Sequence, residues 1–275
     1  MVHPAAAGGS RAGRGAAGGC PDGVRRLEAQ AQFPDPGGNP AAAAMKGRPL
    51  AFFDFDGTLV SSNVVTQYAF FVRRLPGRAR VWWKQGRMLV RAPAWLALEF
   101  WSRRRFNEAF FREYRGMRED WLRGLAEPLF EEVIRPAIYP GAAGLVAADR
   151  ERGYRTVLVT GSLDVALEPV VRHFGFDEVI SNTLLYDQGA ATGRLAGPLI
   201  AGQEKVEAMA KLCREQGVGM EQARAYSDSF SDRGMLEAVG QPAAVNPDRR
   251  LRRLALERGW PVLALKEGRN GNARA

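Results

Sequence analysis

Cysteine and histidine are scarce in this sequence of 275 residues. The two cysteines, Cys20 and Cys213, lie far apart, and the two histidines are His3 and His173. These numbers exclude a disulfide framework and a zinc site built from several Cys or His ligands, and they favour a reducing, cytoplasmic compartment. His173 falls in a helix-like run, where we expect a surface or packing role for it and not catalysis.

Long apolar runs are absent as well. The longest candidate, residues 88–101, is interrupted by Arg91, Pro93 and Glu99 and is too short to cross a bilayer. A secretory signal peptide needs a continuous apolar stretch, which the N-terminal region does not contain. The sequence therefore predicts neither a membrane-spanning helix nor a signal peptide.

Residues 1–44 lack the apolar periodicity of a folded segment. They consist largely of Ala, Gly and Pro with scattered Arg, a composition typical of disorder. A transit peptide is an alternative, although serine is scarce in this region. Because Met45 leads directly into the first expected strand, we hypothesise that Met45 is the true start of the protein.

Acidic residues are fewer than basic ones, and the formal net charge is +9. Such a charge suits nucleic acid, anionic lipid or a phosphorylated substrate. Most of the excess lies in residues 61–136, which hold fifteen Lys and Arg against eight Asp and Glu. No recognised nucleic-acid-binding module accompanies it, so we expect no nucleic-acid partner.

Two carboxylates follow an apolar run in the string AFFDFDGTLV, residues 51–60. The run is typical of a buried strand in a parallel sheet, and ligands bind where such strands end. Asp54 and Asp56 alternate along the chain and can converge on one point. Their repulsion is relieved by a hard cation such as Mg²⁺, on which one carboxylate can attack phosphorus while the other carries a proton. The alternative is an ordinary Asp-Gly turn after a strand.

A second candidate site element is the string 156–162, in which an apolar strand ends at Thr160 and continues into Gly161 and Ser162. With a helix opening at Asp164, the hydroxyl and the helix amides would form a phosphate cradle. Simple helix capping is the alternative for a Thr-Gly-Ser string.

Two later segments supply further candidates. Lys205, in a helix expected over 202–216, is a candidate charge clamp, while an exposed helix lysine is the alternative and Lys211 is its competitor. Asp228 and Asp232 follow a short strand and indicate a metal-binding loop. The alternative for this pair is turn chemistry with a cap for the next helix.

The segment 61–136 shows the helical spacing of aromatic and aliphatic residues and predicts an all-helical insertion of several helices. Arg112 and Arg115, on either side of Tyr114, are candidates for the substrate side. A solvated basic face is the alternative for these charges and the one we prefer for most of the arginines.

The sequence thus holds four motifs in this order: Asp54 to Thr58, Thr160, Lys205, and Asp228 with Asp232. They resemble the motifs of the haloacid dehalogenase (HAD) superfamily, specifically of subfamily IB, which includes phosphoserine phosphatase. The resemblance covers about residues 50–263 and implies an α/β fold, a doubly wound (Rossmann-like) parallel sheet with a helical C1 cap after the first strand. The alternation of strands and helices independently favours such a sheet. The implied core is 45–60 with 137–270, and the implied cap is 61–136.

The resemblance also implies a role for each motif residue. Asp54 would be the nucleophile that forms an aspartyl-phosphate, and Asp56 would protonate the leaving alcohol and then activate water. The other implied roles are Mg²⁺ binding by Asp54, the Asp56 backbone carbonyl and Asp228, support by Asp232, and phosphate binding by Thr160, Gly161 and Lys205.

Several positions depart from the pattern of phosphoserine phosphatases: motif II is Thr-Gly-Ser, and motif IV has Ser227 and Ser229 where glycines are usual. The departure that matters most is Asn63, which stands where phosphoserine phosphatases carry a Glu for the substrate ammonium. An amide cannot neutralise an amine as a carboxylate can. We therefore expect hydrolysis of a small or amphiphilic, more anionic phosphomonoester. The alternatives are phosphoryl transfer to an acceptor other than water, and a lipid phosphate phosphatase that binds anionic membrane through a basic cap with four tryptophans, Trp82, Trp83, Trp95 and Trp101. For these aromatics we favour packing in the cap over membrane insertion, and no oligomeric state follows from the sequence.

Overall fold

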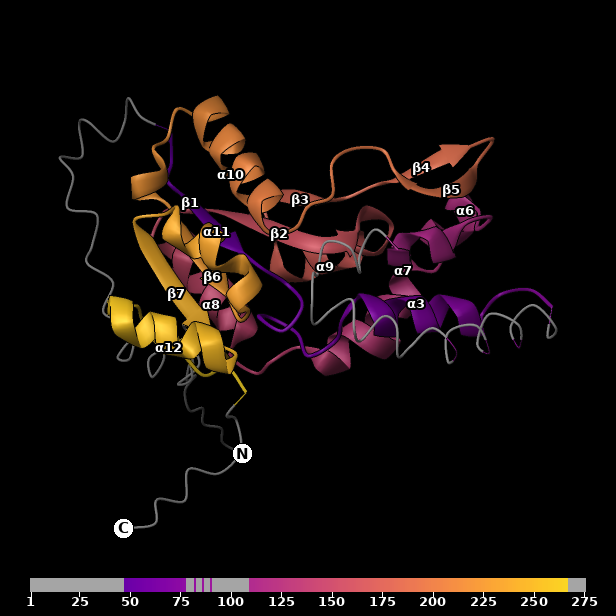
Figure 1. The fold of residues 1–275 in the computed structure, drawn as a ribbon, viewed down its shortest axis with the longest axis horizontal. Helices are drawn as coiled ribbons and strands as arrows, with labels where there is room; N and C mark the ends of the chain where they lie inside the picture. The colour runs from indigo at the N-terminus through magenta and orange to yellow at the C-terminus, as the bar shows by residue number, and fades with distance from the viewer. Residues whose placement is uncertain (1–46, 78–81, 83–85, 87–89, 91–108, 267–275) are drawn as a thin grey trace, which may run out of the picture.

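A six-stranded parallel sheet forms the centre of the computed structural model, which describes residues 47–77, 82, 86, 90 and 109–266 (Figure 1). Its strand order is β3-β2-β1-β6-β7-β8, and every neighbouring pair is parallel. The strands are β1 Leu50–Phe53, β2 Arg155–Leu163, β3 Glu178–Asn182, β6 Arg224–Ser227, β7 Gln241–Val245 and β8 Val262–Leu263. Because the chain winds outward from β1 in both directions, the predicted doubly wound, Rossmann-like α/β fold is confirmed.

Helices cover both faces of the sheet because β1 is apolar on both sides. Leu50 and Phe52 share one buried cluster with residues of α10, α11 and α12, whereas Ala51 and Phe53 share the other with residues of α8 and α9. Successive strand side chains point to opposite faces, which explains this alternation. These helices are α8 Ala142–Glu151, α9 Glu168–Phe174, α10 Gln203–Glu215, α11 Arg233–Glu237 and α12 Arg249–Arg258. Three short helical turns lie between β2 and α11 in the chain: η4 Asp164–Ala166, η5 Met220–Gln222 and η6 Phe230–Asp232.

The described elements between β1 and α8 are all helical. They are α3 Val64–Arg73, η1 Arg112–Tyr114, α6 Glu119–Gly124, α7 Ala126–Leu129, η2 Phe130–Ile134 and η3 Arg135–Ala137. Their core is aromatic: the ring of Tyr68 lies 5.3 Å from Phe110 and 5.0 Å from Tyr114, centroid to centroid, and all three are buried. Trp83, Trp95 and Trp101 lie outside the described residues, and so does the N-terminal segment 1–44. The domain boundaries therefore stay predictions.

A two-stranded antiparallel hairpin, β4 Leu184–Asp187 and β5 Ala190–Leu195, follows the sheet strand β3. It lies beside α6 at the end of the molecule away from β7 (Figure 1). Backbone hydrogen bonds join it to the helical insertion: Gly116 donates to Ala191 at 2.8 Å, and the amide of Ala191 donates to Met117 at 2.7 Å. Two segments distant in sequence thus form one structural layer.

The structure differs from the sequence-based prediction at the end of β2. The strand does not end at Thr160 but continues to Leu163, with a register shift against β3 after Val159. The helix expected to open at Asp164 is a single 3-10 turn, and the α-helix proper begins at Glu168. The prediction that the strand ends at Thr160 and that an α-helix opens at Asp164, so that its amides and the Thr160 hydroxyl form a phosphate cradle, was therefore wrong.

Candidate active site

Asp54 directly follows β1 at the carboxyl edge of the sheet. Its backbone amide donates to the carbonyl of Tyr226 on the neighbouring strand β6 at 3.0 Å. The chain then turns at Gly57, whose φ is 87°, a left-handed value that glycine adopts without strain. A Cβ at this position would lie 2.2 Å from a carboxylate oxygen of Asp228. The turn therefore needs glycine in order to bring the two acidic segments together.

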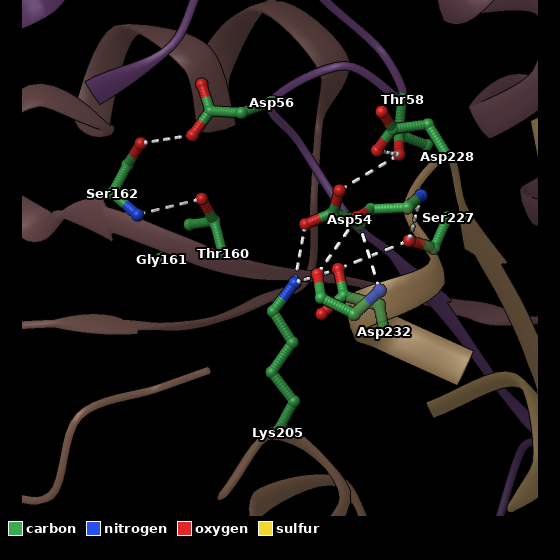
Figure 2. Close-up of polar contacts among 12 residues, drawn as sticks. Asp54, Asp56, Thr58, Thr160, Gly161, Ser162, Lys205, Ser227, Asp228 and Asp232 are labelled. Atoms are coloured by element: carbon green, nitrogen blue, oxygen red, sulfur yellow. Dashed lines mark hydrogen bonds and ion pairs between the residues drawn. The ribbon is translucent and has the colours of Figure 1, made fainter. Parts of the chain in front are cut away.

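Lys205, near the start of α10, lies between two buried carboxylates. Its Nζ is 2.6 Å from Asp54 Oδ1 and 2.9 Å from Asp232 Oδ2 (Figure 2). Burial alone would lower the pKa of Lys205, but the charges of Asp232 and Asp54 outweigh it and raise the pKa above its ordinary value. The lysine is thus protonated and neutralises part of the acidic pair. Lys211, its competitor in the sequence, is 70% exposed in its side chain.

The Thr58 hydroxyl links Asp54 to Asp228. Thr58 Oγ1 is 2.9 Å from Asp54 Oδ2 and 3.1 Å from Asp228 Oδ1 (Figure 2). A hydroxyl has one hydrogen, so it can donate to only one of these carboxylates at a time. The carboxylate that does not receive this hydrogen then has its oxygen next to the hydroxyl oxygen with no hydrogen between them. A cation would stabilise this arrangement.

The residues at this point fit a hard cation. Asp54 and Asp228 offer carboxylate oxygens, and Mg²⁺ in proteins is commonly held by one or two carboxylates with the remaining positions filled by water or substrate. Over the described part of the chain, no group of three or more His, Cys, Asp or Glu side chains is placed to hold a metal. The predicted Mg²⁺ ligands are not a group of this kind. They are the two carboxylates of Asp54 and Asp228 and the backbone carbonyl of Asp56.

Thr160 and Gly161 lie in β2, beside β1, at the same edge of the sheet (Figure 2). Thr160 is fully buried, and its Oγ1 accepts a hydrogen bond from the Ser162 amide at 3.0 Å. The carbonyl of Gly161 accepts a hydrogen bond from Asn182 Nδ2 at 2.8 Å. These contacts fix the strand end next to Asp54, and the phosphate-binding role of both residues stays a prediction.

The sequence matches a known protein family whose motifs include the residues at this edge of the sheet. The model for haloacid dehalogenase-like hydrolases matches residues 51–237, which span all four motifs. The chain belongs to this family. The resemblance predicted from the motifs is thereby confirmed.

Relatives of this HAD hydrolase include named phosphatases. A probable phosphatase of Mycobacterium tuberculosis is 30% identical over 243 residues, which cover 86% of this chain and 82% of the relative. Phosphoserine phosphatase SerB1 of the same organism is 31% identical over 219 residues, 77% of this chain and 69% of the relative. A crystal structure of a protein of unknown function from Bordetella pertussis is similar with a TM-score of 0.68 and 27% identity, over 80% of this chain and 100% of that one. These findings confirm the predicted enzyme class, a HAD-like phosphatase.

Three of the predicted site residues of this HAD hydrolase lie in the helical segment. Asn63 is the N-cap of α3, and its side chain accepts hydrogen bonds from the amides of Val65 at 3.0 Å and Thr66 at 3.1 Å. Arg112 and Arg115 are exposed at η1, next to β5. The structure thus shows a capping role for Asn63, while substrate contacts of all three residues stay predictions.

Replacement of Asn63 by alanine is expected to lower the free energy of unfolding by about 1 kcal/mol, because the first turn of α3 loses its side-chain cap. The kcat should fall by less than about threefold if capping is the main role. Thermal unfolding and steady-state kinetics measure the two effects. Asn63→Asp keeps a capping oxygen and is the matched control; a large loss of activity with unchanged stability in the alanine variant would instead favour substrate contact.

Sequence reasoning missed two residues near the site. Ser162 Oγ lies 2.9 Å from Asp56 Oδ2, and Gln67 of α3 has its Nε2 3.4 Å from Asp56 Oδ1. The available signal for Ser162 was its position, because it directly follows the predicted site residues Thr160 and Gly161. Gln67 is a buried polar residue in a largely apolar helix, a weak signal that many buried polar residues share.

Proposed function

We propose that this protein is a Mg²⁺-dependent phosphomonoester hydrolase that acts through an aspartyl-phosphate on Asp54. The observation that carries the proposal is the position of this carboxylate: it lies at the carboxyl edge of β1, between Lys205 and Thr58, with Asp228 on the far side of the threonine hydroxyl. A buried carboxylate oriented by fixed neighbours is suited to attack phosphorus.

The surrounding groups support the same reaction. Phosphoryl transfer depends mainly on positioning and on neutralising the phosphoryl oxygens, and the buried Lys205 cation lies within contact distance of the nucleophile. Asp232 holds the lysine in place at 2.9 Å and itself accepts a hydrogen bond from the Ser227 hydroxyl at 3.2 Å. When bound between Asp54 and Asp228, Mg²⁺ would supply further positive charge for the phosphoryl oxygens. Asp56 would donate a proton to the leaving alcohol and accept one from water.

The proposed substrate is a small or amphiphilic phosphorylated metabolite other than phosphoserine. One relative is named a phosphoserine phosphatase, but the carboxylate expected for a substrate ammonium is replaced by Asn63, whose side-chain oxygen is used by the helix cap. A panel of phosphorylated metabolites and lipids, with phosphoserine included, tests this. A kcat/KM for phosphoserine well above that of every other ester would contradict it.

Two alternatives are phosphoryl transfer to an acceptor other than water and binding to an anionic membrane. No contact among the described residues favours either of them. Transfer to an acceptor other than water would give phosphorylated alcohol when alcohols are added to the assay, which product analysis detects. Membrane binding through the tryptophans rests on residues outside the described part, apart from Trp82, which is 70% exposed. No helix in the described ranges is both long enough and apolar enough to cross a membrane.

Removal of divalent cations is expected to reduce hydrolysis of p-nitrophenyl phosphate by at least about a hundredfold, because the negative charges of Asp54, Asp228 and the substrate phosphate would then face one another. The measurement is the initial rate after treatment with EDTA, followed by titration with Mg²⁺ and, separately, with Ca²⁺. Restoration by Mg²⁺ supports the proposal. Full activity of a metal-free sample, verified by elemental analysis, would contradict it.

A further inference from the structure

The carboxylate of Asp56 is held by two polar side chains that the proposed mechanism has not used. Ser162 Oγ lies 2.9 Å from Asp56 Oδ2 (Figure 2), and Gln67 Nε2 lies 3.4 Å from Asp56 Oδ1. Gln67 Nε2 is also 3.3 Å from Ser162 Oγ, so the three side chains form a closed ring of contacts. Ser162 and Gln67 are buried, with exposed fractions of 0% and 3%. The two donor side chains are therefore shielded from solvent, whereas the carboxylate of Asp56 is partly exposed.

The chemistry of the groups determines the direction of each hydrogen bond. An amide nitrogen carries two hydrogens and no acceptor, so Gln67 donates to both Asp56 and Ser162. Ser162 Oγ accepts from Gln67, and its single hydrogen points to Asp56. The opposite amide orientation would place the oxygen of Gln67 against a carboxylate. Both neighbours thus donate to Asp56, and each of its oxygens has its own donor.

We propose that Ser162 and Gln67 are positioning residues for Asp56, an inference that rests on the proposed function. The short bond from Ser162 fixes Oδ2 and so sets the plane of the carboxylate. The bond from Gln67 to Oδ1 is long and weak. Oδ1 is therefore the oxygen that exchanges its partner for the ester oxygen of the substrate.

The reaction defines what this orientation must achieve. In the first step a bond forms between Asp54 and phosphorus, the bond from phosphorus to the alcohol oxygen breaks, and the proton on Asp56 moves to that oxygen. In the second step water attacks phosphorus, its proton moves to Asp56, and the bond to Asp54 breaks. Proton transfer needs an aligned carboxylate within hydrogen-bond reach. Loss of the Ser162 hydroxyl should therefore impair proton transfer and leave phosphate binding intact.

The test compares two esters that differ in their need for a proton. The leaving group of p-nitrophenyl phosphate departs as a stable anion, whereas the alkoxide of an alkyl phosphate must be protonated. For Ser162→Ala we expect kcat/KM to fall about tenfold with the alkyl ester and less than about twofold with the aryl ester. Gln67→Met, which keeps the length of the side chain but has no donor, should show the same contrast with a loss of about threefold for the alkyl ester.

The matched control is Ser62→Ala, since Ser62 Oγ is likewise buried but has no hydrogen-bond partner among the described residues. We expect this variant to lose less than about twofold with either ester, and thermal unfolding verifies that all variants are folded. An equal loss of Ser162→Ala with both esters, or no loss with the alkyl ester, would overturn the positioning role while the hydrolase assignment stands. If the unmodified protein hydrolysed neither ester, the proposed function would be wrong and the positioning role with it.

Discussion

Asp54→Asn is expected to reduce the hydrolysis of phosphomonoesters by at least about a thousandfold, because an amide cannot form the aspartyl-phosphate. The substitution keeps the size of the side chain, and Lys205 keeps its second partner, Asp232, at 2.9 Å. The variant should therefore fold. The measurement is kcat/KM with p-nitrophenyl phosphate in the presence of Mg²⁺, together with a thermal unfolding curve that reports the folded fraction.

The matched control is Asp187→Asn, which removes the same charge from an exposed position at the end of β4. It should keep activity within about twofold of the unmodified protein. Trapping of a phosphoryl group on the unmodified protein, followed by its loss in Asp54→Asn, would place the intermediate on this side chain. If Asp54→Asn were folded and kept more than one tenth of the activity, the nucleophile would have to be another residue.

Lys205→Met is expected to have the second large effect, on stability as well as on activity. Removal of the ammonium leaves the buried carboxylates of Asp54 and Asp232 without their shared counter-charge. Breaking a buried ion pair by removing one partner typically costs about 3–5 kcal/mol. Chemical denaturation measures this loss, and hydrolysis should fall to background because the phosphoryl oxygens lose their lysine partner.

A comparison within α10 separates this effect from a general loss of charge. Lys211→Met changes an exposed lysine on the same helix, which pairs with Glu215 at 3.8 Å, and should alter the free energy of unfolding by less than about 0.5 kcal/mol. The double variant Lys205→Met with Asp232→Asn removes one of the two stranded charges. It should recover part of the stability and none of the activity. Equal stability of the Lys205 and Lys211 variants would mean that the buried pair does not stabilise the fold.

The sequence predicted the architecture, and the gathering of the candidate site residues at one sheet edge, for a physical reason. Apolar runs of strand length mark buried parallel strands, and the carboxyl ends of such strands meet at one edge. Asp54, Thr160 and Asp228 were placed at that edge because each was assigned to the end of a strand. Lys205 was assigned a phosphate-binding role only through the resemblance to the HAD motifs, and the residue by itself left an exposed lysine as an equal alternative.

Other features depend on partners that the local pattern does not reveal. Arg224 is a charged residue in β6, yet it is buried and paired with Asp149 of α8, a residue 75 positions away. Burial raises the pKa of Asp149, and the Arg224 charge and the Tyr226 hydroxyl oppose this by stabilising the carboxylate. The contact of Ser162 with Asp56 likewise spans 106 positions. Spacing rules describe one element at a time, so such pairs become visible only in the folded chain.

The hairpin β4–β5 has a consequence for attempts to exchange the helical insertion between members of this family. Its edge is bonded to the chain near Met117 by backbone hydrogen bonds, such as that from the Gly116 amide to Ala191. A chimera that received foreign residues 61–136 alone would lose the matching register along this seam. Grafts of the helical insertion should therefore include residues 184–195 as a second, separate insert.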